Sequence, residues 1–307
     1  MTPANKSAVL IAGPTASGKT TLAVSIAKRI GGSVINADSM QVYADLDILS
    51  ARPDADERQG VEHLLFAHVD ARVNYSAGKW LADAAVAMES VRASGRVPVV
   101  AGGTGLYFKA LLHGLSQIPA VPEAVRASVR QRLADMAPEA MHAAATAADP
   151  EAAARIGPGD RQRLERVLEV FEATGKALSS FQGNRSAALL RAEDCACIFL
   201  SPGRDLLRER IDRRFDAMIE RGAIEEVRRL MDRGLDPALP AMRAHGVPGL
   251  IDYLQGRSTL EEAVERGKSD TRRYAKRQFT WFRHQLPEFE WFAPETAETD
   301  ALQRAGR

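Results

Sequence analysis

The first third of the chain alternates short apolar runs with longer amphipathic stretches. This alternation is typical of a parallel sheet flanked by helices. We therefore expect strands at residues 9–12, 34–37, 64–69 and 97–101, and helices at residues 20–30, 77–93 and 102–112.

The pattern changes between residues 114 and 190, where Ala and Arg dominate, strand-like runs vanish, and Pro or Gly recurs. An apolar run returns at residues 195–200, so the helical segment interrupts the sheet and does not follow it. Helices are expected again at residues 205–220, 224–233 and 260–285, before a short closing segment at 289–292. The prediction is an α/β core with a helical C-terminal part in residues 1–113 and 191–307, and a helical insertion domain in residues 114–190.

Charge and composition add little to this picture. The 307 residues carry 41 Lys and Arg against 40 Asp and Glu, so any basic surface must be local. No apolar run approaches the roughly 18 residues that span a bilayer, so we expect a cytoplasmic protein without a membrane partner. We also expect a monomer. The only cysteines, Cys195 and Cys197, should lie on one face of a strand as small core residues in a reducing compartment.

One motif carries clear chemistry. Residues 13–20 read Gly13-Pro14-Thr15-Ala16-Ser17-Gly18-Lys19-Thr20, which fits the P-loop pattern and lies between a predicted strand and helix. Its glycines let backbone N–H groups converge on a phosphate at the positive end of the helix. Lys19 adds a point charge, and Thr20 adds a hydroxyl for Mg²⁺. The motif does not distinguish the phosphates of ATP from another diphosphate.

A second candidate site follows the next predicted strand, where Asp38-Ser39-Met40-Gln41 and Tyr43 occur. The carboxyl ends of neighbouring parallel strands face one crevice, so Asp38 should lie across it from the P-loop. A carboxylate there could hold a metal ion or accept a proton from an attacking nucleophile. A plain turn residue at a strand end is the alternative.

The third motif, Gly102-Gly103-Thr104-Gly105-Leu106-Tyr107, follows the strand predicted at residues 97–101. In an ATP-hydrolysing protein this strand is expected to end in an Asp that organises Mg²⁺ and water, but here glycine follows it. This argues against an ordinary ATPase. Taken alone, Thr104 would be a helix cap.

In this order and spacing, GPTASGKT, DSMQVY and GGTGLY resemble the tRNA dimethylallyltransferase family, also called tRNA isopentenyltransferases. The likeness extends along nearly the whole chain. Residues 162–170 resemble the family's P-x-R-L-x-R-x-L-E-V segment, with Arg161 where proline is common. Residues 213–227 resemble R-F-x-x-M-x-x-x-G-x-x-x-E-V, and residues 271–283 resemble T-R-x-x-A-K-R-Q-x-T-W-x-R.

The chain departs from the family pattern in two places. Residues 49–53 read L-S-A-R-P where G-T-A-K-P is usual. Residues 245–249 read H-G-V-P-G where many members carry I-G-Y-[KR]-[EQ], so only Gly246 is kept in a loop that the family uses for tRNA contact.

The resemblance implies a P-loop NTPase-like fold and a prenyl transfer. Ser17, Gly18, Lys19 and Thr20 would bind the diphosphate of dimethylallyl diphosphate with Mg²⁺, and Arg214 would reach it from the far side. Asp38 would accept a proton from the exocyclic amine of the adenosine that follows the anticodon, with Thr104 as its hydrogen-bonding neighbour. That base must leave its stack, at a cost of a few kcal/mol. Gln41 could then read its edge.

The resemblance also implies contacts with the anticodon stem-loop of tRNA. In the C-terminal helix, four cations at i, i+1, i+4 and i+5 lie on one side, for which a solvated face is the alternative. The expected tRNA contacts are Asp38, Ser39, Met40, Gln41 and Thr104 near the P-loop, Arg126, Gln162, Arg163, Leu164, Glu165 and Arg166 in the insertion, and Arg272, Arg273, Lys276, Arg277 and Gln278 in the C-terminal helix.

Three functions of different classes fit the residues: prenyl transfer to tRNA, a small-molecule or nucleotide kinase that uses ATP in the P-loop, and a non-catalytic RNA-binding or nucleotide-switch protein. A variant of the first, transfer to a free adenine nucleotide, would leave the basic helical segments without a purpose.

Overall fold

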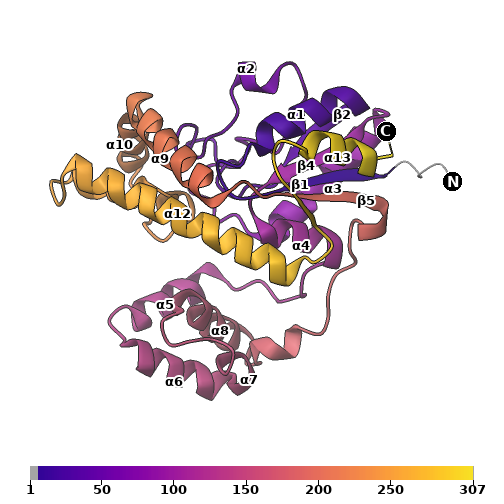
Figure 1. The fold of residues 1–307 in the computed structure, drawn as a ribbon. Helices are drawn as coiled ribbons and strands as arrows, with labels where there is room; N and C mark the ends of the chain where they lie inside the picture. Colours follow the sequence, from indigo (N-terminus) through magenta and orange to yellow (C-terminus); the bar gives the residue numbers. More distant parts are fainter. Residues whose placement is uncertain (1–5, 307) are drawn as a thin grey trace. The chain divides into compact units, whose positions relative to one another are not determined.

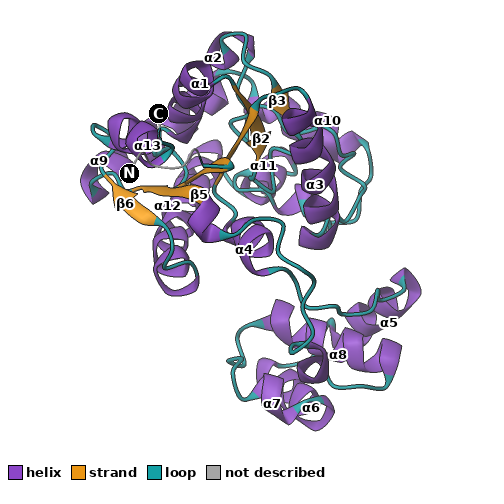
Figure 2. Ribbon diagram, turned by 90° about the vertical axis from the view of Figure 1, so that its right-hand side faces the viewer, coloured by secondary structure: helices purple, strands orange, loops and turns teal. Residues whose placement is uncertain are grey.

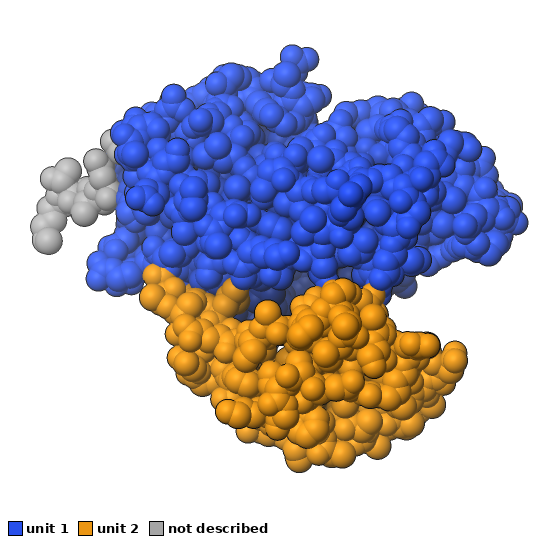
Figure 3. All heavy atoms as spheres, turned by 180° about the vertical axis from the view of Figure 1, so that it is seen from behind, with its two compact units in different colours: residues 1–112, 189–307 blue, residues 113–188 orange. Residues whose placement is uncertain are grey.

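A computed structural model describes residues 6–306 of the chain, which form two compact units (Figure 3). Unit 1 combines the residues up to Leu112 with those from Leu189 onward, and unit 2 comprises residues 113–188. Within residues 6–306, we find no helix that is long and apolar enough to cross a membrane.

Unit 1 is built on a six-stranded sheet in which each neighbouring pair is parallel, as predicted (Figures 1 and 2). The strand order is β3-β2-β4-β1-β5-β6, so β4 lies between β1 and β2. Their bounds are β1 Ala8–Ala12, β2 Gly32–Asn36, β3 His63–Leu64, β4 Val97–Gly102, β5 Cys195–Leu200 and β6 Glu290–Phe292.

Alternate residues of the strands pack into two separate cores. On one face, Val9, Ile11 and Val99 contact α1 (Lys19–Ile30) and α13 (Ala297–Arg304). The opposite face packs against α3 (Ala77–Ala93), α4 (Gly105–His113) and α12 (Leu260–Gln285). Cys195 and Cys197 lie together on this second face, where both are free and buried, so their placement as core residues is confirmed.

The helices of unit 1 follow the prediction closely, with three additions. The observed helices α3 and α12 have the predicted bounds, and α9 (Arg204–Glu220) and α10 (Ala223–Asp232) begin one residue early. The sequence did not predict α2 (Ala55–Arg58), α11 (Val247–Leu254) or α13. The closing segment is the edge strand β6, which pairs with β5.

The strand predicted at residues 64–69 is wrong beyond Leu64. Leu65 and Ala67 have φ of 63° and 51°, a left-handed backbone that no strand can contain. Val69 makes only an isolated bridge with Tyr43. The apolar side chains of this segment therefore pack from a loop. The short helix α2 (Ala55–Arg58) lies earlier in the chain, before β3.

Unit 2 is helical and has a core of its own. It contains α5 (Glu123–Leu133), α6 (Pro138–Ala148), α7 (Pro150–Ala153), α8 (Arg161–Thr174) and a 3-10 turn at Leu178–Phe181. The buried Asp149 joins the start of α7 to the 3-10 turn. Its carboxylate accepts from Ala152 N in α7 and from Ser179 N at 2.7 Å in the turn. Hydrogen bonds of this kind hold a small core together where apolar area is limited.

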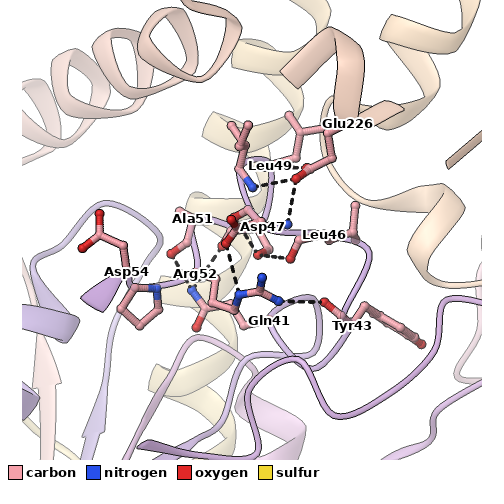
Figure 4. Close-up of polar contacts among 12 residues, drawn as sticks. Gln41, Tyr43, Leu46, Asp47, Leu49, Ala51, Arg52, Asp54 and Glu226 are labelled. Carbon is pink, nitrogen blue, oxygen red and sulfur yellow. Dashed lines mark hydrogen bonds and ion pairs between the residues drawn. The ribbon is translucent and has the colours of Figure 1, made fainter. Parts of the chain in front are cut away.

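One buried carboxylate fixes the loop that follows β2 (Figure 4). Glu226 of α10 is 3% exposed and accepts from Asp47 N and Ile48 N at 2.8 Å and from Leu49 N at 3.0 Å. Gln41 supports the same loop, since its amide donates to the carbonyls of Ser50 and Ala51. Hydrogen bonds thus join α10 directly to the loop after β2, although the bonded residues are 177 or more positions apart in the chain.

We predict that Glu226→Gln lowers the free energy of unfolding by about 2–3 kcal/mol, because the amide has one acceptor oxygen and would turn its NH₂ group toward backbone donors. Chemical denaturation measures this change. The matched control is Glu225→Gln, an exposed neighbour on the same helix, which should change stability by no more than about 0.5 kcal/mol. Equal effects of the two substitutions would contradict the assigned role of Glu226.

Candidate functional site

The P-loop connects β1 to α1, as the sequence predicted. Gly18 has φ 97°, in the left-handed region that favours glycine. Gly13 is needed for a different reason, since a Cβ there would lie 2.9 Å from Ser17 Oγ and 3.0 Å from the Leu200 carbonyl oxygen. The loop therefore folds tightly over the ends of β1 and β5.

Several polar groups of this loop are ready for an anion. Ser17 is fully buried, and its hydroxyl has no hydrogen-bond partner in the described part of the chain. The first N–H groups of α1 have no side-chain cap. Lys19 Nζ donates to the Pro14 carbonyl at 2.7 Å. An uncapped helix start beside a lysine is a favourable place for phosphate.

Asp38 follows β2 and is held by a residue that the sequence analysis missed. Asn36 is fully buried, and its Oδ1 accepts from Asp38 N at 2.8 Å while its Nδ2 donates to the Asp38 carbonyl at 3.0 Å. The Asp38 carboxylate accepts from Met40 N at 2.9 Å. A polar residue at the end of a buried strand was the available signal. These bonds aim the carboxylate before any ligand binds.

The glycines of the third motif allow close approaches. A Cβ on Gly102 would overlap Ala37, falling 2.7 Å from its Cα and closer still to its carbonyl group. Gly103 and Gly105 face Gln278 and Trp281 of α12 in the same way. The motif thus lets the ends of β2 and β4 and the side of α12 converge.

Thr104 does not pair with Asp38 as expected. Its Oγ1 accepts from Ser39 N at 2.9 Å. The backbone after Asp38 turns back, which brings Ser39 and not the carboxylate to the threonine. Thr104 therefore positions the Asp38 loop.

Gln278 has a structural place where tRNA contact was expected. It is 5% exposed; its Oε1 accepts from Thr15 N at 3.0 Å and its Nε2 donates to the Gly103 carbonyl at 2.8 Å. The side chain joins the P-loop to the third motif and is closed off from a large ligand. The expectation of direct tRNA contact is corrected accordingly.

Arg214 of α9 reaches the P-loop, where it donates to Thr15 Oγ1. Burial lowers the pKa of the Lys19 ammonium to about 8, with Asp38 raising it and Arg214 lowering it. Burial also lowers the pKa of Arg214, which Asp38 raises. Two cations and one carboxylate thus share a desolvated space, in which an added anion would be strongly favoured.

Two hollows meet at these groups. Both are lined by Thr15, Asp38, Ser50, Arg214 and Met218. The first continues along the P-loop, past Lys19 and Thr20. The second continues between α9 and α12, past the apolar side chains of Leu49, Ile211 and Phe215. One hollow is therefore suited to phosphate and the other to an apolar group.

The second hollow has a polar rim formed by Tyr274 and His245, whose rings lie 4.8 Å apart. Burial lowers the pKa of His245, so the imidazole is neutral at pH 7. Burial, assisted by Asp38, raises the pKa of Tyr274. The sequence assigned neither residue a role, because His245 replaces the Ile of the family pattern and Tyr274 lies at a variable position of the C-terminal one.

The nearby segment that departs from the family pattern keeps its glycine for a physical reason. Gly246 has φ 94°, and a Cβ there would lie 3.0 Å from Leu49 Cδ2 and 3.1 Å from Phe215 Cζ. Residues 247–249 start α11, with Pro248 in its first turn.

The cations of α12 differ in their availability. Arg273, Lys276 and Arg277 are exposed, although Arg273 pairs with Asp270 one turn earlier. Arg272 is directed to α9, where it pairs with Asp212 at 2.5 Å. Of the four cations expected to face tRNA, three are therefore exposed and Arg272 is directed elsewhere.

In unit 2, the predicted tRNA contacts are only partly exposed. Leu164 is fully buried in the core of the unit, so it cannot contact RNA, and this prediction is wrong. Glu165 lies 4.0 Å from Arg130, and Arg166 pairs with the buried Glu169. Gln162 and Arg163 are exposed, while Arg126 is half-buried and its Nε has no hydrogen-bond partner within residues 6–306.

Comparisons with known proteins agree with this geometry. The model of the IPP transferase family matches residues 41–285. A tRNA dimethylallyltransferase of Nitrobacter hamburgensis is 58% identical over 95% of this chain and 92% of its own length, and one of Methylobacterium nodulans is 57% identical over 96% and 98%.

Solved structures are similar over almost the whole chain. The tRNA isopentenylpyrophosphate transferase of Bacillus halodurans has a TM-score of 0.70 and 35% identity, covering 98% of this chain and 97% of that one. A eukaryotic dimethylallyltransferase described as acting on tRNA has a TM-score of 0.78 and 29% identity, covering 98% and 77%. By its sequence and its fold, the chain belongs to the IPP transferase family, the family of the tRNA dimethylallyltransferases.

Proposed function

We propose that the protein transfers the dimethylallyl group of dimethylallyl diphosphate to the exocyclic amine of the adenosine 3′-adjacent to the anticodon in tRNA, releasing diphosphate. One observation carries this proposal: Asp38 lies at the junction of a P-loop hollow and an apolar hollow, beside Lys19 and Arg214. A donor with a diphosphate head and a short apolar tail matches both hollows.

The diphosphate head would lie in the P-loop. The backbone N–H groups at Gly18 and Lys19, the buried Ser17 hydroxyl and the Lys19 ammonium would bind its oxygens. Arg214 would bind it from α9, by exchanging Thr15 Oγ1 for a phosphate oxygen. Together these groups stabilise the negative charge that develops as the allylic carbon departs.

The residues present also suit Mg²⁺. This ion usually keeps several waters and binds through substrate phosphates and one or two protein oxygens, so it needs no acidic cluster. Thr20 Oγ1, in the first turn of α1 and in the lining of the P-loop hollow, would be its protein ligand. When bound, Mg²⁺ would neutralise charge on the leaving diphosphate.

The reaction then requires a nucleophile and a base. The adenine nitrogen attacks the allylic carbon, the carbon–oxygen bond to diphosphate breaks, a carbon–nitrogen bond forms, and Asp38 takes the released proton. Asn36 and Thr104 hold the Asp38 loop in place through their hydrogen bonds. Gln41 uses its NH₂ group on Ser50 and Ala51, so only its carbonyl oxygen is left to read the base.

A kinase that uses ATP in the same loop is less compatible with these residues. β4 ends in Gly102, so the position from which an NTPase organises Mg²⁺ and water carries no carboxylate. The apolar side chains beside Asp38 also offer nothing to a phosphoryl acceptor.

The tRNA would bind through exposed cations. Arg273, Lys276 and Arg277 of α12 are suited to backbone phosphates, and Gln162 and Arg163 of unit 2 provide further contacts. The near-balanced charge of the whole chain makes these local groups decisive.

Asp38→Asn should reduce prenyl transfer by at least about a hundredfold, because general-base catalysis contributes roughly 10²–10⁴ in rate. The amide oxygen can still accept from Met40 N, so the loop is preserved. Dimethylallyl diphosphate should bind nearly as before, measured by calorimetry beside single-turnover transfer to tRNA. Wild-type turnover in the variant would remove Asp38 from the mechanism.

Binding of dimethylallyl diphosphate should weaken as the pH rises through about 8, where the free Lys19 ammonium loses its proton. An anion binds the charged form better, so Kd should rise by up to about tenfold per pH unit above that pKa. Calorimetric titrations from about pH 7 to about pH 9.5 test this. Lys19→Met should bind weakly with a flat profile, and a flat wild-type profile would count against the lysine.

Affinity for tRNA should fall steeply with salt, and Arg273→Ala with Lys276→Ala should lower the slope of log K against log salt by about one to two. Filter binding at several salt concentrations measures this slope. Arg92→Ala, an exposed position on α3, is the control and should leave it unchanged. A slope that ignores the double substitution would assign this face of α12 to solvent.

A further inference from the structure

We propose that the Phe215 ring sets the length of prenyl chain that the protein accepts. This inference rests on the proposed function and names the residue that limits its donor. The ring closes the apolar hollow beside Asp38, and two glycines from other segments hold it there.

Phe215 is one of the apolar side chains that line the hollow beside Asp38. Its side chain is 3% exposed and lines the hollow with Leu49, Ile211 and Met218. Arg214, the preceding residue, contacts the P-loop, so α9 presents a diphosphate ligand and an apolar wall from adjacent positions. The distance between the diphosphate group of a donor and the Phe215 ring is therefore set by a single helix.

The first glycine behind the ring is Gly267, in the interior of α12. Glycine at such a position is less favourable than alanine by about 1 kcal/mol. A Cβ there would overlap the ring, falling 2.8 Å from Cε1 and closer still to Cζ. The ring thus occupies the space in which any other residue of α12 would place its side chain.

The second glycine is Gly246, whose left-handed backbone brings it against the same ring. A Cβ there would lie 3.1 Å from Cζ and 3.2 Å from Cε2. Neither glycine lines the hollow, and both pack against the ring. The ring could not move toward either glycine without displacing that segment of backbone.

Ion pairs hold α9 and α12 together on both sides of this contact. Lys268, next to Gly267, pairs with Asp216 at 2.7 Å, and Arg272 pairs with Asp212 at 2.5 Å. The carboxylates come from α9, on either side of Phe215. A wall fixed in this way rejects a longer tail sterically, and close packing makes even small volume changes matter.

The chemistry is unchanged with a longer donor. In geranyl diphosphate the same carbon–oxygen bond breaks, the same carbon–nitrogen bond to adenine forms, diphosphate leaves, and Asp38 takes the proton. Only the length of the tail differs. Shortening the side chain at position 215 opens space toward Gly267, and that space is continuous with the hollow.

The test compares kcat/KM for geranyl and dimethylallyl diphosphate with unmodified tRNA as acceptor. Phe215→Leu should raise the ratio of geranyl to dimethylallyl use at least about tenfold, since hydrophobic pockets discriminate added or missing methylenes by 10-fold or more. Adding Gly267→Ala to this variant refills the opened space and should return the ratio to near the wild-type value. Phe289→Leu, an equally buried substitution away from the hollow, should leave it unchanged.

Phe215→Met serves if the leucine variant does not fold, as judged by its melting temperature, and it should shift the ratio in the same direction. A folded variant that keeps dimethylallyl transfer with a wild-type ratio would overturn the inference, as would an equal shift in Phe289→Leu. No transfer of dimethylallyl by the wild-type protein would instead overturn the proposed function, and with it this inference.

Discussion

The parallel pairing of β4 with both β1 and β2 determines where the P-loop and Asp38 lie. Ala12 pairs with Gly102, and Asn36 with Ala101, so three strands end at one level. The loops after them must then share one crevice. Gly102 is essential to this arrangement, since any side chain there would overlap the carbonyl of Ala37 and drive β2 from β4. The register of these three strands therefore determines the position of the site.

The helices complete what the sheet begins. α12 reaches the loops through Gln278, which bonds Thr15 and Gly103 at once. α9 adds Arg214, which donates to Thr15 of the P-loop, and Phe215, which lines the apolar hollow. α10 fixes the loop after β2 through Glu226 (Figures 1 and 4). α9 thus supplies positive charge and apolar surface to the site, while α10 and α12 fix the loops around it. The sheet alone does not determine where these three helices lie.

The sequence predicted those features that depend on local patterns. The strands of β1, β4 and β5 are short apolar runs, and α3 and α12 have clear helical periods, so both kinds of element were found. The P-loop and Asp38 followed from motif and strand order. The prediction of a strand after Leu64 was wrong because an apolar run does not reveal a left-handed backbone.

The rest depends on contacts between distant residues. The motif that contains Glu226 does not show that its carboxylate binds a loop 177 residues earlier, and the contact between His245 and Tyr274 comes from packing. Gln278 and Leu164 were assigned to RNA from motif position, yet burial gives each a structural place. Motifs identify which residues matter, and the three-dimensional contacts decide whether a residue binds a ligand or positions one that does.

The proposed function requires the P-loop to hold diphosphate as a leaving group while adenine becomes the nucleophile. This can be tested by incubating the protein with Mg²⁺, unmodified tRNA, ATP and dimethylallyl diphosphate that carries a heavy isotope in the oxygen between the allylic carbon and phosphorus. We expect one prenylated adenosine for each diphosphate released, with the heavy oxygen in that diphosphate. Cleavage of the terminal phosphate of ATP, with the allylic donor left intact, would contradict it.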